Sequence, residues 1–232
     1  LWAIVPFSYT RTSPARGRLA GTYFLFTHWS VGVRVTVVRA VCFDLDGTLF
    51  DDRQYARMGL ENAAAELLRR TGRDLTEEFI EAYFSDGHRK ATFDVVLSSA
   101  GLADDHVPAL VNAYHDTSGP LVPYPDATAT LHSLGEAYDI GVITGGTNGR
   151  GKLSRLGLDD SVDELIVTAN REDSKREPDP FVEMADRFEV THGSVVFVGD
   201  RPSLDFPQPN RLGMTTIRLR RGHYATATAS GD

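Results

Sequence analysis

Hydrophobic and polar positions along the chain follow two different periods in turn. Short apolar runs rich in β-branched residues, typical of buried parallel strands, lie at 37–43, 138–144, 164–168, 194–198 and 215–219. Apolar residues spaced three or four apart predict helices between these runs, at 126–136, 148–156 and 180–189. This alternation of strand and helix predicts an α/β fold built on a doubly wound parallel sheet.

A longer helical stretch interrupts this alternation after the first strand. Helical spacing, broken by Gly, Asp and Pro signals, predicts helices at 52–71, 76–85, 89–100 and 104–116. We therefore expect a helical subdomain at 51–120, inserted into a core formed by 38–50 and 121–224. Residues 225–232 are expected to form a flexible tail.

The first part of the chain follows neither period. Residues 1–38 contain four arginines and no acid, and they precede the first predicted strand of the core. Three interpretations are open: an extension that is not native or is disordered, a cleaved signal segment, and a genuine structured arm. We favour the extension and place it at residues 1–37.

The composition is that of a globular protein and argues against several classes of partner and site. The 232 residues are 41% hydrophobic and 24% charged, which is typical of a globular chain. A formal net charge of −8 argues against nucleic acid as a partner, because a phosphate backbone requires a basic face. The single cysteine excludes disulfide scaffolds and multi-cysteine metal sites. No apolar run reaches the length of a membrane-spanning helix, so we expect no membrane partner and a cytoplasmic location.

The basic residues are mostly arginine. Only three lysines, Lys90, Lys152 and Lys175, accompany 21 arginines. An aspartate-rich, lysine-poor surface suits high salt, but a GC-rich genome that favours arginine codons explains it equally well. Both explanations stay open.

The most specific chemical signal follows the first strand, in the run Asp44-Leu45-Asp46-Gly47-Thr48. Residues two apart in an extended segment point the same way, so Asp44 and Asp46 are expected to converge on one reacting centre. One carboxylate can attack as a nucleophile while the other transfers a proton. Gly47 permits a sharp turn out of the strand.

This run resembles motif I of the haloacid dehalogenase superfamily, a Rossmann-like fold whose members are mostly magnesium-dependent phosphatases. Ile143-Thr144-Gly145-Gly146 resembles motif II, and Gly199-Asp200 with Asp205 resembles motif IV. The resemblance spans residues 38–222 and implies that the helical insert is a cap over the active site.

Motif III departs from the pattern of these proteins. Where they carry Lys-Pro-Asp-Pro, this chain has Glu177-Pro178-Asp179-Pro180. Lys175 is the first candidate for the missing cation, Arg176 is the second, and the third possibility is that no residue replaces it. Because Pro178 favours an extended approach, the side chains of Lys175 and Glu177 are expected to face the same side.

The resemblance implies a phosphatase that hydrolyses a small phosphomonoester through an aspartyl-phosphate. Asp44 would be the nucleophile, Asp46 the acid and base, and Lys175 the cation. Thr144 and Gly145 would hold the phosphoryl group, and Mg²⁺ would be bound by Asp44, Asp46, Asp200 and Asp205. A phosphomutase of the β-phosphoglucomutase type and a non-catalytic phosphate-binding protein are the alternatives. The sequence does not indicate the oligomeric state.

Overall fold

A five-stranded parallel sheet forms the centre of the protein. This computed structural model describes residues 3–8, 22–27, 37–169 and 171–228. The strands of the sheet are β3 (Ala40–Phe43), β4 (Asp139–Thr144), β5 (Glu164–Val167), β6 (Val195–Gly199) and β7 (Thr215–Arg218). Their spatial order is β5-β4-β3-β6-β7, and every neighbouring pair is parallel. The predicted doubly wound α/β fold is confirmed.

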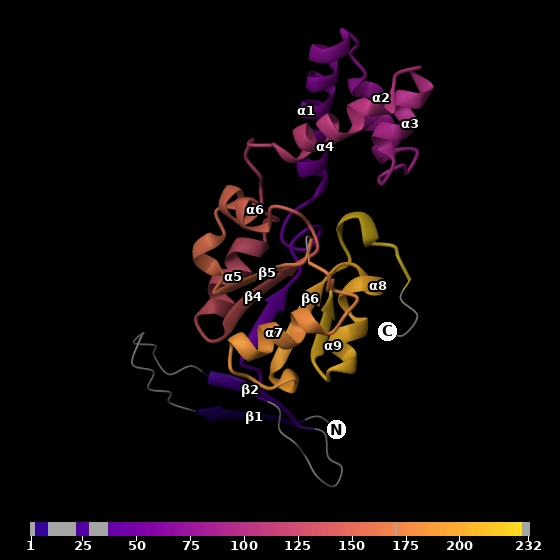
Figure 1. Cartoon of the computed structure of the whole chain (residues 1–232). Coiled ribbons are helices and arrows are strands. Elements are labelled where there is room, and N and C mark those ends of the chain that lie inside the picture. The colour runs from indigo at the N-terminus through magenta and orange to yellow at the C-terminus, as the bar shows by residue number, and fades with distance from the viewer. Residues whose placement is uncertain (1–2, 9–21, 28–36, 170, 229–232) are drawn as a thin grey trace.

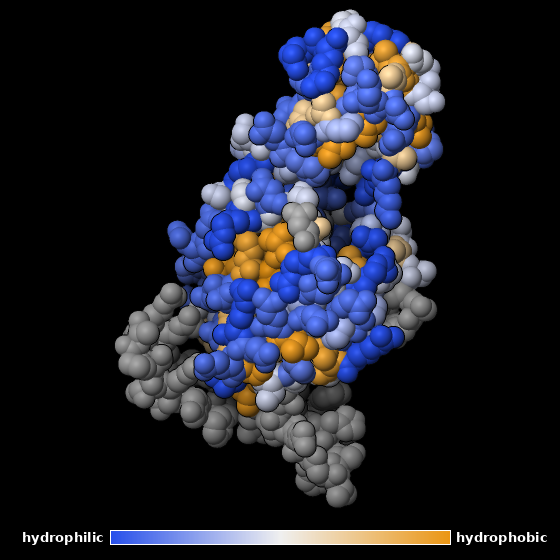
Figure 2. Space-filling view, viewed as in Figure 1, coloured by the Kyte–Doolittle hydropathy of each residue, from blue (hydrophilic) through white to orange (hydrophobic). Residues whose placement is uncertain are grey.

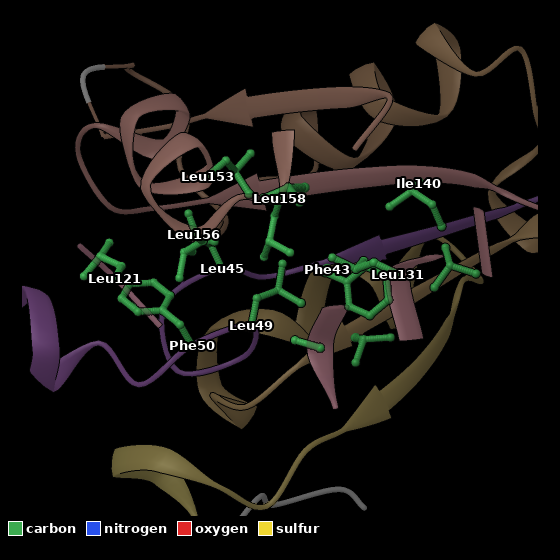
Figure 3. Packing of buried hydrophobic residues seen from close by; sticks show 14 of the residues in the cluster. Phe43, Leu45, Leu49, Phe50, Leu121, Leu131, Ile140, Leu153, Leu156 and Leu158 are labelled. Carbon is green, nitrogen blue, oxygen red and sulfur yellow. The ribbon is translucent and has the colours of Figure 1, made fainter. Parts of the chain in front are cut away.

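Helices cover both faces of this sheet because alternate strand residues point to opposite sides. Val41 and Phe43 face α5 (Ala127–Gly135) and α6 (Gly149–Leu156), in a core that Figure 3 shows closely packed around Leu45. Ala40 and Cys42 face the opposite way, toward α7 (Asp179–Arg187). Two short helices that the apolar pattern did not predict, α8 (Pro202–Asp205) and α9 (Pro207–Arg211), follow β6.

Four helices between β3 and α5 form a separate lobe, at the top of Figure 1. They are α1 (Arg53–Thr71), α2 (Thr76–Phe84), α3 (Thr92–Ser99) and α4 (Val107–His115). The lobe has its own apolar core, which includes the fully buried Leu60, Phe79 and Leu110. We call this lobe the insert.

Two linkers join the insert to the sheet, and they are bonded to each other. The Gln54 side-chain amide donates to the Val122 carbonyl oxygen over 2.9 Å and accepts from the Val122 N–H over 3.0 Å. Phe50 pairs with Pro123 in an isolated bridge beside them. Arg155 on α6 donates to the backbone carbonyl oxygens of residues 117 and 119, which secures the returning linker to the core.

The remaining described elements lie at the ends of the chain and in the loops. Within 1–37, β1 (Ala3–Ser8) and β2 (Thr22–Thr27) pair antiparallel in a separate two-stranded sheet, and the rest of the expected extension lies almost wholly outside the described residues. Single 3-10 turns occur at Asp104–His106, Asp159–Ser161, His192–Ser194 and Gly222–Tyr224. Of the expected tail, residues 225–228 are described. In the described part of the chain, no helix combines the length and the apolar character needed to cross a membrane.

Candidate active site

Three buried carboxylates meet at the carboxyl edge of the sheet. Asp44 directly follows β3, Asp200 directly follows β6, and Asp205 ends α8. One oxygen of each side chain lies within 4.8 Å of an oxygen of the others, and none of the three residues is more than 5% exposed. The edge where parallel strands end thus gathers side chains that are far apart in the sequence, as expected for this class of sheet.

Lys175 lies between two of these carboxylates. Its Nζ donates to Asp44 Oδ1 and to Asp205 Oδ1, each over 2.5 Å, and the side chain is 2% exposed. Arg176 and Glu177 are exposed. The loop before α7 therefore places a lysine beside Asp44, although its register differs from that of motif III.

The expectation that Lys175 and Glu177 face the same side is wrong. The N–H of Glu177 donates to the Ser174 carbonyl oxygen over 2.9 Å, which makes these four residues a turn instead of an extended segment. This turn buries Lys175 and leaves Glu177 in solvent, so the acid in place of the usual lysine does not enter the site.

Burial and crowding make the carboxylate cluster electrostatically unfavourable without a cation. Burial raises the pKa of Asp44, against the opposing attraction of Lys175. Burial, with repulsion from Asp205 added to it, raises the pKa of Asp200 to about 7. For Lys175, burial lowers the pKa, but the attraction of Asp44 and Asp205 outweighs it and leaves the pKa above the usual lysine value. Three acids therefore share one lysine.

The donors present fit a Mg²⁺ ion, which prefers carboxylate and carbonyl oxygens. Asp200 is well placed, since the Thr48 hydroxyl donates to its Oδ1 over a long 3.4 Å. Gly47, at φ 84°, lies so close to Asp200 that an added Cβ would stand 2.5 Å from Oδ2. Asp205 fits direct ligation less well, because its Oδ1 accepts from Lys175 and its Oδ2 accepts from the Arg201 N–H over 2.8 Å.

Asp46 bonds to a different set of groups from Asp44. Its Oδ2 accepts from the Thr144 hydroxyl at the end of β4 over 3.2 Å, and its Oδ1 accepts from Lys152 Nζ over 2.6 Å. The Thr144 hydroxyl in turn accepts from the Gly146 N–H over 3.1 Å. Gly145, expected to hold the phosphoryl group, is exposed in the turn beside them. The loop after β4 thus encloses the second aspartate.

Lys152 is the site residue that the sequence analysis missed. The sequence placed it only on a helix at 148–156, and its pairing with Asp46 spans 106 residues. A signal was present in the composition, because two of the three lysines of this arginine-rich chain are buried, and both lie in this site.

A hollow lies between the insert and the core. Figure 2 shows it lined by hydrophilic residues. His115 Nδ1 at the end of α4 lies 3.1 Å from the Thr147 hydroxyl in the loop after β4, which links the two lobes. Asp52, just before α1, has a buried Oδ1 with no hydrogen-bond partner among the described residues, and burial and then repulsion from Asp46 raise the pKa of its carboxyl.

Comparison with known families decides the affiliation of this fold and site. The profile of the haloacid dehalogenase-like hydrolases matches residues 38–208. The chain belongs to this family. The match begins two residues before β3 and continues into α9, so it includes the insert and every residue of the carboxylate cluster.

Individual relatives within the family are phosphatases. A glyceraldehyde 3-phosphate phosphatase from Methanopyrus kandleri is 34% identical over 211 residues, which cover 84% of this chain and 90% of the relative. A ribulose-1,5-bisphosphate 5-phosphatase from Halopiger xanaduensis is 28% identical over 83% of this chain and 89% of the relative. These similarities identify the chain as a hydrolase of phosphoric monoesters.

Solved structures share the fold. A phosphatase of this family from Thermococcus onnurineus superposes with a TM-score of 0.57 at 28% identity, covering 83% of this chain and 92% of that one. An L-2-haloacid dehalogenase from Xanthobacter autotrophicus gives a TM-score of 0.55 at 24% identity, with coverage of 82% and 80%. The second likeness supports the fold alone.

Proposed function

We propose that this family member is a Mg²⁺-dependent phosphatase that removes phosphate from a small phosphosugar through an aspartyl-phosphate on Asp44. The observation that carries the proposal is the position of Asp44, buried at the end of β3 with Lys175 Nζ 2.5 Å from its Oδ1. A carboxylate that is fixed and paired with a cation can approach an anionic phosphoryl group with less repulsion than a free one.

The chain's own residues carry out both proton transfers and orient the reacting groups. Asp44 attacks phosphorus, and Asp46 donates a proton to the departing alcohol oxygen. Asp46 then accepts a proton from the water that hydrolyses the aspartyl-phosphate. Thr144 and the loop that follows it hold the phosphoryl oxygens, and Lys175 holds Asp44 in line.

A divalent metal fits beside this nucleophile. Asp44, Asp200 and the Asp46 main-chain carbonyl would hold Mg²⁺, while Asp205 holds Lys175. When bound, the metal supplies charge that offsets the phosphoryl oxygens and the crowded carboxylates.

The helical insert and the names of the relatives indicate the substrate class. We propose that residues 51–120 act as a cap over the core formed by 38–50 and 121–224, and that the hydrophilic hollow between them receives the sugar part of the substrate. Hydroxyl and carbonyl groups of a triose or pentose phosphate are suited to a polar lining of this kind. The glyceraldehyde 3-phosphate and ribulose bisphosphate phosphatases among the relatives support this class. A cytoplasmic location stays a prediction.

A panel of phosphate esters tests the proposal. We expect release of inorganic phosphate from glyceraldehyde 3-phosphate with Mg²⁺, at a higher kcat/KM than from phosphoglycolate or nucleotides. Isomerisation of a sugar phosphate without phosphate release would instead indicate a phosphomutase. Binding without turnover of any ester, including p-nitrophenyl phosphate, would indicate a non-catalytic protein.

A further inference from the structure

The two aspartates after β3 are held by two different lysines. Lys175 contacts Asp44, whereas Lys152 Nζ lies 2.6 Å from Asp46 Oδ1. The first pair belongs to the nucleophile. The second pair joins a group with a proposed proton-transfer role to a cation from another part of the fold, and the function proposed above gives this cation no part.

Lys152 is confined to this contact by its surroundings. Its side chain is 6% exposed, and its ammonium lies 4.5 Å from the centre of the Tyr55 ring, on the first turn of α1. An added Cβ on Gly146 would stand 2.9 Å from Lys152 Nζ and 2.3 Å from Asp46 Oδ2. The aromatic ring and the glycine loop therefore enclose Lys152 and leave it little freedom to point elsewhere, while the Asp46 side chain stays 24% exposed.

The carboxylate of Asp46 is in turn fixed at both oxygens. Lys152 holds Oδ1 and the Thr144 hydroxyl holds Oδ2. A substrate phosphoryl group that recruits the Thr144 hydroxyl releases Oδ2 and leaves Oδ1 on Lys152. The ammonium then remains as the partner that keeps the carboxyl group in a single orientation.

We propose that Lys152 is a positioning residue that acts through Asp46, holding Oδ1 so that Oδ2 faces the leaving-group oxygen. The inference rests on the phosphatase function proposed above. A stability role explains the contact less well, because a buried ion pair contributes little net stability when the cost of removing both charges from water is included.

Protons and electron pairs balance in both steps of the proposed hydrolysis. An Asp44 oxygen forms a bond to phosphorus while the bond from phosphorus to the ester oxygen breaks. The ester oxygen takes the electron pair and the proton from Asp46 Oδ2, so the alcohol departs and Asp46 becomes an anion beside Lys152. Water then attacks phosphorus and gives a proton to Oδ2, the bond to Asp44 breaks, and inorganic phosphate leaves.

Two aryl esters of similar size, p-nitrophenyl phosphate and phenyl phosphate, distinguish a positioning role in proton transfer from a role in phosphate binding or folding. p-Nitrophenol departs readily without a proton, whereas phenol requires one, so loss of the acid affects phenyl phosphate far more. We expect Lys152→Met to lower kcat/KM for phenyl phosphate about 100-fold and for p-nitrophenyl phosphate less than about 5-fold. Since kcat/KM extends only through formation of the aspartyl-phosphate, later hydrolysis does not obscure the comparison.

A double variant tests whether Lys152 acts through Asp46. Asp46→Asn should show the same dependence on the leaving group, and adding Lys152→Met to it should cost less than about 3-fold more. Lys152→Arg should restore the ratio between the two esters toward that of the unmodified protein. Lys90→Met, on the exposed lysine of the insert, is the matched control and should change neither ester.

Three results would overturn the inference. Equal losses on both esters, with the circular dichroism spectrum unchanged, would show that Lys152 binds phosphate or only supports the fold. Independent, multiplicative losses in the double variant would separate Lys152 from Asp46. The third result is an unmodified protein that hydrolyses neither ester with Mg²⁺, which would contradict the proposed function itself, and this role for Lys152 with it.

If Lys152→Met does not fold, Lys152→Gln takes its place, and the same two criteria apply to it.

Discussion

Lys175 shows how one residue can restore a site whose usual motif is absent. It stands two positions before Glu177, yet its ammonium bonds both Asp44 and Asp205. The turn at 174–177 makes this possible, since it buries the lysine and leaves the two following charged side chains in solvent. A cation of the kind that phosphoryl transfer requires thus lies beside Asp44, the proposed nucleophile.

Removing this cation should cost catalysis far more than removing its neighbour. We expect Lys175→Ala to lower kcat by about 10²–10³, the loss usual for one electrostatic stabiliser, because Asp44 is then left without its partner. Arg176→Ala is the matched control and should retain near-normal turnover. Steady-state kinetics on p-nitrophenyl phosphate measures both, and the assignment would move to Arg176 if the two results were reversed.

Asp44 itself provides a stricter test of the proposed chemistry. Asp44→Asn keeps the shape of the side chain but removes the attacking carboxylate, so turnover should fall to background while the far-UV circular dichroism spectrum is unchanged. Denaturation of the unmodified enzyme during turnover should trap a phosphoryl group on Asp44, detectable by mass spectrometry. Substantial turnover by this variant would exclude an aspartyl-phosphate on Asp44.

The raised pKa of Asp200 predicts how metal and pH act together on stability. Burial raises this pKa to about 7, whereas in the unfolded chain it is about 4. Between these values the folded protein binds more protons than the unfolded chain, so in chelator the contribution of this group to stability falls as pH rises. Mg²⁺ binds the deprotonated carboxylates and should offset that loss.

The melting temperature with Mg²⁺ and with EDTA, at pH 5.5 and 7.5, measures this coupling. We expect Mg²⁺ to raise the melting temperature relative to EDTA by more at pH 7.5 than at pH 5.5. Asp200→Asn should reduce the dependence on pH. An equal effect of Mg²⁺ at both pH values would argue against a metal at this cluster.

At the scale of elements, the loop between β4 and α6 controls the second aspartate. It carries Thr144 and Gly146 and leads directly into the helix that bears Lys152. The chain has no side chain at position 146 because the Asp46 carboxylate occupies that space. Of the two neighbouring glycines in this loop, Gly146 has no room for a side chain, whereas Gly145 has room for one.

A pair of alanine substitutions tests this difference. Gly146→Ala would place a Cβ 2.3 Å from Asp46 Oδ2, so we expect the carboxylate to be displaced and kcat to fall at least about 10-fold. Gly145→Ala would place a Cβ no closer than 4.0 Å to its nearest neighbour, Thr168 Oγ1, and keeps the backbone N–H of residue 145 available to the phosphoryl group, so its kcat should stay within about 2-fold of that of the unmodified protein. Similar kinetics for the two variants would show that Asp46 does not depend on this loop.

The sequence predicted elements better than it predicted contacts. The five strands of the sheet could be predicted because each is a short β-branched run between polar segments, and the two aspartates after β3 could be predicted from their position at a strand end. The partner of Asp46 could not, because nothing local to Lys152 indicates which of many acids it meets. The turn at 174–177 was missed because the preference before proline favours an extended segment, and the hydrogen bond from Glu177 to Ser174 outweighs it.

At the scale of the whole molecule, the apolar cores connect the sheet, its helices and the insert. Among the residues whose side chains the structure describes, the clusters of buried apolar side chains and the partly buried ones packed on them run from Val38 to Leu219. The family match begins at residue 38. Because this match already includes the whole carboxylate cluster, we expect residues 1–34 to contribute little to folding or turnover.

Truncation tests this expectation. A chain that begins at Val35 should match the full chain in kcat/KM and melt within about 2 °C of it, since a change of this size is less than about 1 kcal/mol for a domain of this length. Loss of folding on truncation would show that the β1–β2 hairpin is an integral arm, and the interpretation as an extension would be wrong.

The bonds that join the two linkers have a consequence for how this architecture can diversify. Gln54 binds only the backbone of Val122, and Arg155 reaches the backbone carbonyl oxygens of residues 117 and 119. Backbone groups are supplied by almost any sequence, so these bonds place few demands on the residues of the lobe. The demands that remain come from side chains of the lobe that contact the core, chiefly the Tyr55 ring beside Lys152 and Arg155, the Thr117 hydroxyl bonded by Arg155, and His115 beside Thr147. Recombination that keeps these few side chains can exchange the rest of the helical lobe while the residues below it are inherited unchanged, which makes substrate range and catalytic power largely separable traits in evolution and in engineering.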